Sequence, residues 1–132
     1  MWLNEGLATY AEWLWQEDDD GKPARKTFEE FYDGTHPESG GIWDFPPADP
    51  PSGARVSDKP VYGRGAMVVH KVREAVGDDT FYDILHAWTK RYRHRNADTQ
   101  QFIALCEEKS GKDLSGVFDT WLFSSKKPAL GR

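Results

Sequence analysis

The sequence predicts an all-α protein, a bundle of about six helices with one long loop rich in proline and glycine. Three observations predict this fold class. Apolar residues recur at helical spacings of three and four, and no stretch alternates as a strand does. Capping and helix-ending residues bound each periodic stretch. The length of 132 residues corresponds to one ordinary domain.

Two helices are predicted before the loop. The first ends at the acidic run 17–20 and Gly21, and the second begins near Pro23 and stops at Gly34. Four apolar residues share one face of the first helix: Leu3, Leu7, Tyr10 and Leu14. Three aromatic residues mark the second: Phe28, Phe31 and Tyr32.

Residues 34–59 are predicted to form the irregular loop. They contain five prolines and several glycines, which exclude a helix. Loops longer than about 15 residues in a compact domain are usually functional or disordered. We expect Trp43 and Phe45 to anchor this loop on the helices.

Four helices are predicted after the loop. The third follows Pro60 and ends at Gly77, and Asp78 and Asp79 cap the fourth. Residues 98–101 form a capping box for the fifth, and the sixth starts at Asp113. The apolar faces of these helices contain Tyr62, Ala66, Val69, Val72 and Val76; Phe81, Leu85, Trp88 and Tyr92; Phe102, Leu105 and Cys106; and Leu114, Val117, Phe118, Trp121 and Leu122. The helical unit is expected to span 1–125, with 126–132 as a polar tail.

Composition excludes several classes of protein. The 17 basic and 22 acidic residues give a net charge of −5, which argues against a nucleic-acid partner. The basic segment 90–95 is interpreted as cations at the C-terminal end of a helix. A single cysteine excludes an internal disulfide, and no apolar run approaches the roughly 18 residues of a membrane span. We expect a soluble chain, whose compartment stays open between cytoplasmic and secreted.

Spacing alone does not identify a metal site. The four histidines show no H-x-x-x-H pattern and are expected at the surface or its boundary, with His70 on the polar side of its helix. Glu5 suits the start of a helix, where a carboxylate interacts well with the helix dipole, and Tyr62 fits a simple core position.

Four segments nevertheless resemble a known family. Residues 2–15, WLNEGLATYAEWLW, are similar to the W-L-N-E-G-[FL]-A signature of the aminopeptidase N family, zinc metallopeptidases of the gluzincin type. Residues 61–73, VYGRGAMVVHKVR, resemble its second signature, and THP at 35–37 matches a recurrent family segment. Residues 98–123 resemble the end of the family's catalytic domain, with its F-x-x-W-L close. The resemblance covers nearly the whole chain, and the four segments occur in the same order as in the family.

The resemblance implies specific roles. The chain corresponds to the C-terminal half of a thermolysin-like catalytic domain. In the family, zinc is held by two histidines of an H-E-x-x-H helix and by the glutamate of N-E-G, here Glu5. The family's tyrosine, here Tyr62, stabilises the oxyanion formed at the scissile carbonyl. The implied reaction is attack of zinc-bound water on a peptide carbonyl, with the H-E-x-x-H glutamate as general base.

The sequence departs from the family in one major respect. Only four residues precede Glu5, so H-E-x-x-H is absent, as is the N-terminal segment that grips the substrate's free amine. Gly63 and Arg64 stand where the family more often has E-K, which keeps a cation at position 64. We expect a fragment that binds zinc weakly and is inactive alone, with the missing N-terminal part of the catalytic domain as its partner. Trp2, Leu3 and Leu7 are expected to pack against that part.

A different class of function remains as an alternative. The chain could be a stand-alone helical protein-interaction module without catalysis. Its binding surface would then be the proline-rich loop or the basic segment 90–95.

Overall fold

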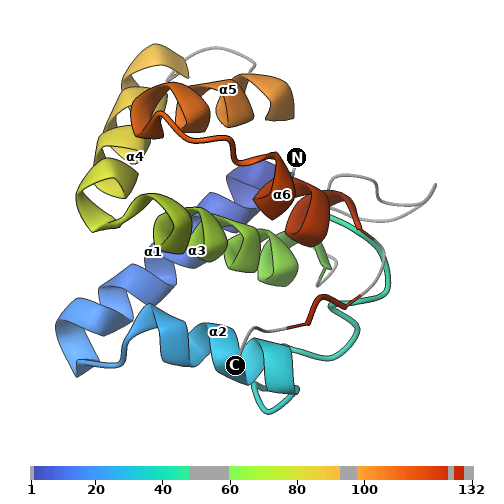
Figure 1. Cartoon of the computed structure of the whole chain (residues 1–132). Helices are drawn as coiled ribbons and strands as arrows, with labels where there is room; N and C mark the ends of the chain where they lie inside the picture. The colour runs from blue at the N-terminus through green and yellow to red at the C-terminus, as the bar shows by residue number, and fades with distance from the viewer. Residues whose placement is uncertain (1, 48–59, 93–97, 125–126, 130–132) are drawn as a thin grey trace.

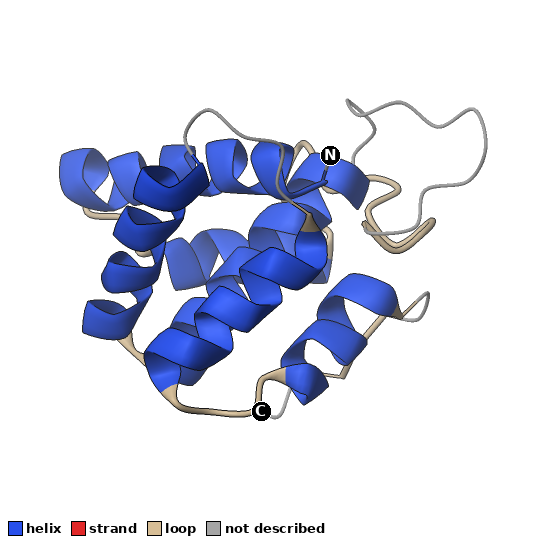
Figure 2. Cartoon of the chain, turned by 90° about the horizontal axis from the view of Figure 1, so that it is seen from above, coloured by secondary structure: helices blue, strands red, loops and turns tan. Residues whose placement is uncertain are grey.

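The computed structural model describes residues 2–47, 60–92, 98–124 and 127–129, and every regular element in these ranges is helical (Figure 2). The elements are α1 (Trp2–Asp20), α2 (Ala24–Asp33), η1 (Pro60–Arg64), α3 (Gly65–Val76), α4 (Asp78–Tyr92), α5 (Thr99–Ser110), α6 (Ser115–Phe118) and η2 (Asp119–Phe123). η1 and η2 are π-helical turns. The predicted all-α class with six helices is confirmed. None of the helices in these ranges is long and apolar enough to cross a membrane.

Helix α3 lies at the centre of the bundle (Figure 1). It crosses α1, with α2 on one side of it and α4 leading to α5 on the other. All residues from Gly65 to His70 are buried, and so is Val72. A helix buried on most sides needs small or apolar residues around its whole circumference, which the sequence GAMVV supplies.

Local sequence explains where the helices end. Gly34 and Gly111 adopt left-handed conformations, with φ of 81° and 67°, at the ends of α2 and α5. The capping box predicted at 98–101 is present, because the Gln101 main-chain N–H donates to Asp98 Oδ1 at 2.8 Å and the Asp98 N–H donates to Gln101 Oε1 at 2.9 Å.

The loop after α2 is irregular, as predicted, through residues 34–47. Trp43 and Phe45 are half-buried and pack on the core. Ile42, which directly precedes Trp43 in the loop, is fully buried. The Trp43 ring contacts those of Tyr32 and Trp121, with centroids 5.8 and 6.4 Å apart. The expected anchoring is therefore confirmed, with Ile42 as an additional anchor. The rest of the predicted loop, 48–59, lies outside the described residues.

Both ends of the described chain are packed against the helices. Trp2 and Leu3 are buried within this chain, and Trp2 Nε1 donates to Thr99 Oγ1 at 2.9 Å. The expectation that these two residues pack against an upstream segment is wrong. At the other end Pro128 is buried, and its carbonyl accepts a 2.6 Å hydrogen bond from the Tyr32 hydroxyl. Of the predicted polar tail, 126 and 130–132 lie outside the described residues.

Candidate active site

Two glycines bring the segments of Glu5 and Tyr62 together. Gly6 follows Glu5 in α1, and Gly65 begins α3 three residues after Tyr62. A Cβ atom built on Gly6 would lie 2.8 Å from the carbonyl carbon of Gly65, and one built on Gly65 would lie 3.2 Å from Gly6 Cα. The helices therefore cross backbone to backbone. A side chain at either position would push the two signature segments apart.

Tyr62 lies in η1 at the edge of a hollow. Its ring is half-buried, and its hydroxyl donates to Glu38 Oε2 at 3.4 Å. Short π-helical turns such as η1 are rare and often occur at functional sites. The hollow has a volume of about 300 Å³ and is lined by Thr9, Glu12, Trp13, Gln16, Phe31, His36, Glu38 and Tyr62.

Glu5 stands in the first turn of α1 and is half-buried. Thr9 and Glu12, four and seven residues further along the same helix, both line the hollow. Residues at these spacings share one helix face, so Glu5 lies on the face of α1 that borders the Tyr62 hollow. The structure thus brings the two residues singled out by the sequence to one region.

The electrostatic character of the hollow is acidic. The His36 ring stacks on Phe31 with centroids 4.1 Å apart, and its Nδ1 accepts a 3.0 Å hydrogen bond from the Glu38 main-chain N–H. Burial lowers the pKa of His36, so the imidazole is neutral near pH 7. The charged groups among the lining residues are the carboxylates of Glu12 and Glu38.

Sequence reasoning missed most residues of this hollow. Glu12 and Gln16 belong to the helical face that begins at Glu5, so helical spacing was the available signal. His36 belongs to the THP segment noted for its resemblance, but nothing in the sequence indicated that Glu38 meets Tyr62. That contact joins residues 24 positions apart and depends on how the loop folds back.

The described residues do not form a complete zinc site. Zinc in proteins normally takes three or four protein ligands. In the described ranges, no group of three histidine, cysteine, aspartate or glutamate side chains is placed to hold a metal ion. A metal site that included Glu5 would need further ligands from outside the described residues.

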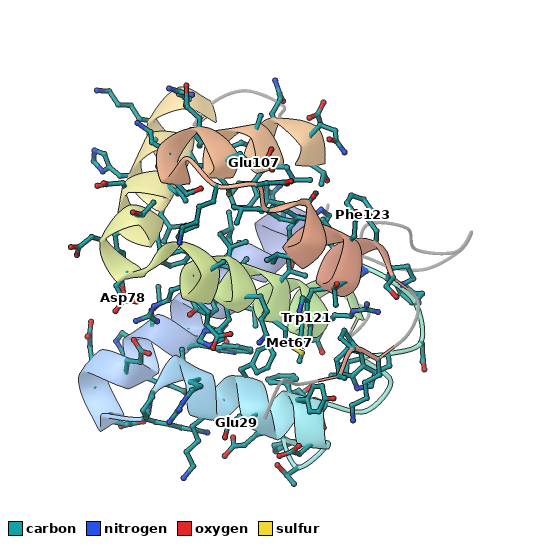
Figure 3. The ribbon with its side chains drawn as sticks, in the orientation of Figure 1. Glu29, Met67, Asp78, Glu107, Trp121 and Phe123 are labelled. Carbon is teal, nitrogen blue, oxygen red and sulfur yellow. The ribbon has the colours of Figure 1, made fainter. Side chains whose placement is uncertain are left out.

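His70 does not lie where the sequence predicted. The side chain is buried, with a relative exposure of 4%, rather than on the polar side of its helix. Its Nδ1 hydrogen-bonds the Tyr10 hydroxyl at 2.7 Å, and its ring lies against Phe28. The error arises because α3 is covered on several sides, whereas periodicity identifies one apolar face. Figure 3 shows the dense side chains around Met67 and Trp121, on the side of α3 that faces α2.

Comparison with known proteins identifies the family of this chain. The model of the peptidase family M1 domain matches residues 1–121. The chain belongs to peptidase family M1. Among M1 relatives, it is 27% identical over 143 residues to aminopeptidase M1-D of Oryza sativa subsp. japonica, and 27% identical over 143 residues to glutamyl aminopeptidase of Bitis rhinoceros. These alignments cover 99% and 98% of the chain.

Solved M1 structures share the fold. The M1 zinc metallopeptidase from Deinococcus radiodurans superposes with a TM-score of 0.78 at 28% identity and covers 99% of this chain. An E323A mutant of the enzyme from that organism, bound to a Tyr-Ser-Ala substrate, matches equally well, with a TM-score of 0.78. The chain spans 16% of the length of the rice relative and 29% of the Deinococcus chain. It therefore corresponds to part of an M1 peptidase.

Proposed function

We propose that this M1 chain is the C-terminal helical part of the catalytic domain of a zinc aminopeptidase that hydrolyses peptide bonds. Family membership supports the reaction class. The observation that carries the proposal is the Gly6–Gly65 contact, because it holds the N-E-G and Y-G-R-G segments against each other beside one hollow.

Glu5 is proposed as the third zinc ligand. A carboxylate supplies the anionic oxygen that completes a three-ligand set while one position remains open. When bound, zinc would supply Lewis-acid polarisation of the carbonyl and activation of water. The other two ligands and the general base are proposed to come from the N-terminal part of the domain, so this chain by itself is proposed to be inactive.

Tyr62 is proposed to stabilise the oxyanion. A phenol is a neutral hydrogen-bond donor, so it can strengthen its hydrogen bond as negative charge develops on the carbonyl oxygen. The present contact with Glu38 is long at 3.4 Å. The aromatic walls of the adjoining hollow, formed by Trp13 and Phe31, provide contact surface for a peptide.

A peptide is the proposed substrate. The Deinococcus enzyme has been crystallised with the Tyr-Ser-Ala substrate and, in another structure with a TM-score of 0.77, an E323A mutant of a two-domain M1 zinc metallopeptidase holds L-tryptophan. The curated relatives are named aminopeptidases, which favours an aminopeptidase for the present chain as well.

The first test is to read the gene upstream of codon 1. The proposal expects an in-frame H-E-x-x-H a short distance before Glu5. The longer protein should then hydrolyse aminoacyl chromogenic substrates and contain zinc, and chelation should abolish the activity. A genuine translation start at Met1, with its own ribosome-binding site, would instead favour the alternative of a stand-alone helical interaction module.

A further inference from the structure

Arg64 is a fully buried cation located between Tyr62 and the centre of α3. Its Nε donates to the Trp121 carbonyl at 3.1 Å, and its two terminal nitrogens donate to the carbonyls of Phe45, at 3.4 Å, and Ser124. The guanidinium also lies 5.2 Å from the centre of the Trp43 ring. In the described part of the chain these partners are carbonyls and an aromatic face, and none is a carboxylate.

The position of these carbonyls explains how a buried cation is stabilised here. Trp121 and Ser124 lie at the C-terminal end of η2, where main-chain carbonyls lack helical partners and carry partial negative charge. Arg64 therefore caps the last helical turn from inside the protein. Burial lowers the pKa of Arg64 to about 10, so the side chain is still charged at neutral pH.

One side chain thus joins three segments distant in sequence. It belongs to η1, which carries Tyr62, and it holds the end of η2 and the loop at Phe45. The same loop carries Glu38, the acceptor of the Tyr62 hydroxyl. The contacts of Arg64 therefore restrain both the segment that carries the phenol and the loop against which the phenol is oriented.

We propose that Arg64 is a positioning residue that fixes the orientation of Tyr62 by fastening η1 to the loop and to the C-terminal end of η2. The catalytic meaning of this placement rests on the proposed function. The placement itself is a property of this chain and is measurable without zinc or substrate.

The test uses the 132-residue chain with its tyrosines labelled with ¹³C at Cζ, and Tyr62→Phe assigns the Tyr62 resonance. Arg64→Lys keeps the charge, but a single ammonium group cannot donate along the three directions that the guanidinium serves. The Tyr62 resonance is expected to shift or to split into several, while those of Tyr10 and Tyr82 stay in place.

Two further variants keep the test decisive. Trp43→Leu removes the ring under the guanidinium and leaves its carbonyl partners. It should therefore shift the Tyr62 resonance in the same direction as Arg64→Lys does, but by a smaller amount. It decides the question alone if Arg64→Lys does not fold. Leu105→Ala, in the buried face of α5, controls for general loss of stability. An unchanged Tyr62 resonance in the folded variants, or an equal change in Leu105→Ala, overturns the proposal.

Activity in the longer protein supplies an independent readout. Arg64→Lys is expected to lower kcat by up to about 100-fold, with KM little changed. The reason is that a displaced donor stabilises the transition state less well but leaves substrate binding little changed. An unchanged kcat contradicts the positioning role. Complete absence of peptidase activity in the wild type refutes the proposed function and leaves the resonance test of Arg64 standing.

Discussion

Gly6 and Gly65 set the distance between the segments that carry Glu5 and Tyr62. Both glycines belong to the quoted signatures, N-E-G and Y-G-R-G, so the sequence placed glycine at the right positions. It did not show that the two glycines face each other, because that contact joins α1 to α3 across 59 positions and exists only once the helices cross. The choice of Glu5 and Tyr62 as candidate site residues came from the resemblance, whereas the contact of Glu38 with Tyr62 depended on how the loop folds.

Gly6→Ala is predicted to destabilise the chain. The new Cβ would lie 2.8 Å from a main-chain carbon that cannot rotate away, so α1 and α3 must separate. Overpacking of this kind typically costs about 1–3 kcal/mol. Urea unfolding of the 132-residue chain measures the loss.

Gly116→Ala is the matched control for that substitution. Gly116 lies within α6, and a Cβ there would meet no atom within 4 Å. The free energy of unfolding of Gly116→Ala should equal that of the wild type or exceed it by up to about 1 kcal/mol, because alanine is a better helix former than glycine. Equal destabilisation by both substitutions would show that the Gly6–Gly65 contact is unimportant.

At the scale of elements, periodicity and caps predicted all six helices, and Gly21, Gly34 and Gly77 follow the ends of α1, α2 and α3 as predicted. The apolar face of α4 was only partly right, since Ile84 is buried and Leu85 half-buried. The π-helical turn η1 was not predicted, because apolar periodicity identifies a helix but not a local widening of its turn. His70 was misplaced for a related reason, since burial from several sides is a tertiary effect.

Stability is predicted to fall in mild acid because of His70. Burial lowers the pKa of His70 to about 4, from an ordinary value near 6.5. Between these values the unfolded chain binds a proton at this position and the folded chain does not. The free energy of unfolding should therefore decrease as the pH falls from about 6.5 to about 4, by roughly 2–3 kcal/mol from this group.

His70→Asn isolates that contribution. Asparagine does not titrate, and it retains a polar group near the position of Nδ1 that can bond the Tyr10 hydroxyl. Its urea-unfolding free energy should depend less steeply on pH between 4 and 6.5 than that of the wild type. Identical slopes for the two proteins would contradict a neutral, buried His70.

At the scale of the whole molecule, three signature segments converge on residues 62–65. Tyr62 borders the hollow, Arg64 binds the end of η2, and Gly65 meets α1. The chain nevertheless covers only 16% of the rice relative, and the described residues contribute one proposed zinc ligand. The remaining ligands could not be predicted from these residues, because they are proposed to belong to another part of the domain.

The 132-residue chain is predicted to bind zinc only weakly. One carboxylate supplies too few ligands to displace the water bound to the ion. Calorimetric titration should show no specific one-to-one site, and Glu5→Gln should give the same trace as the wild type. Submicromolar zinc affinity that is lost in Glu5→Gln would show that this chain forms a site by itself.

The most direct test of the account compares Tyr62→Phe with the wild type in the longer protein. The substitution keeps the ring and removes the one donor proposed to meet the oxyanion. We expect kcat to fall on the order of 10²–10³-fold, with KM, zinc content and melting temperature close to those of the wild type. Glu5→Ala should instead lose zinc. Wild-type turnover in Tyr62→Phe, or a lower melting temperature with turnover intact, would contradict the catalytic assignment.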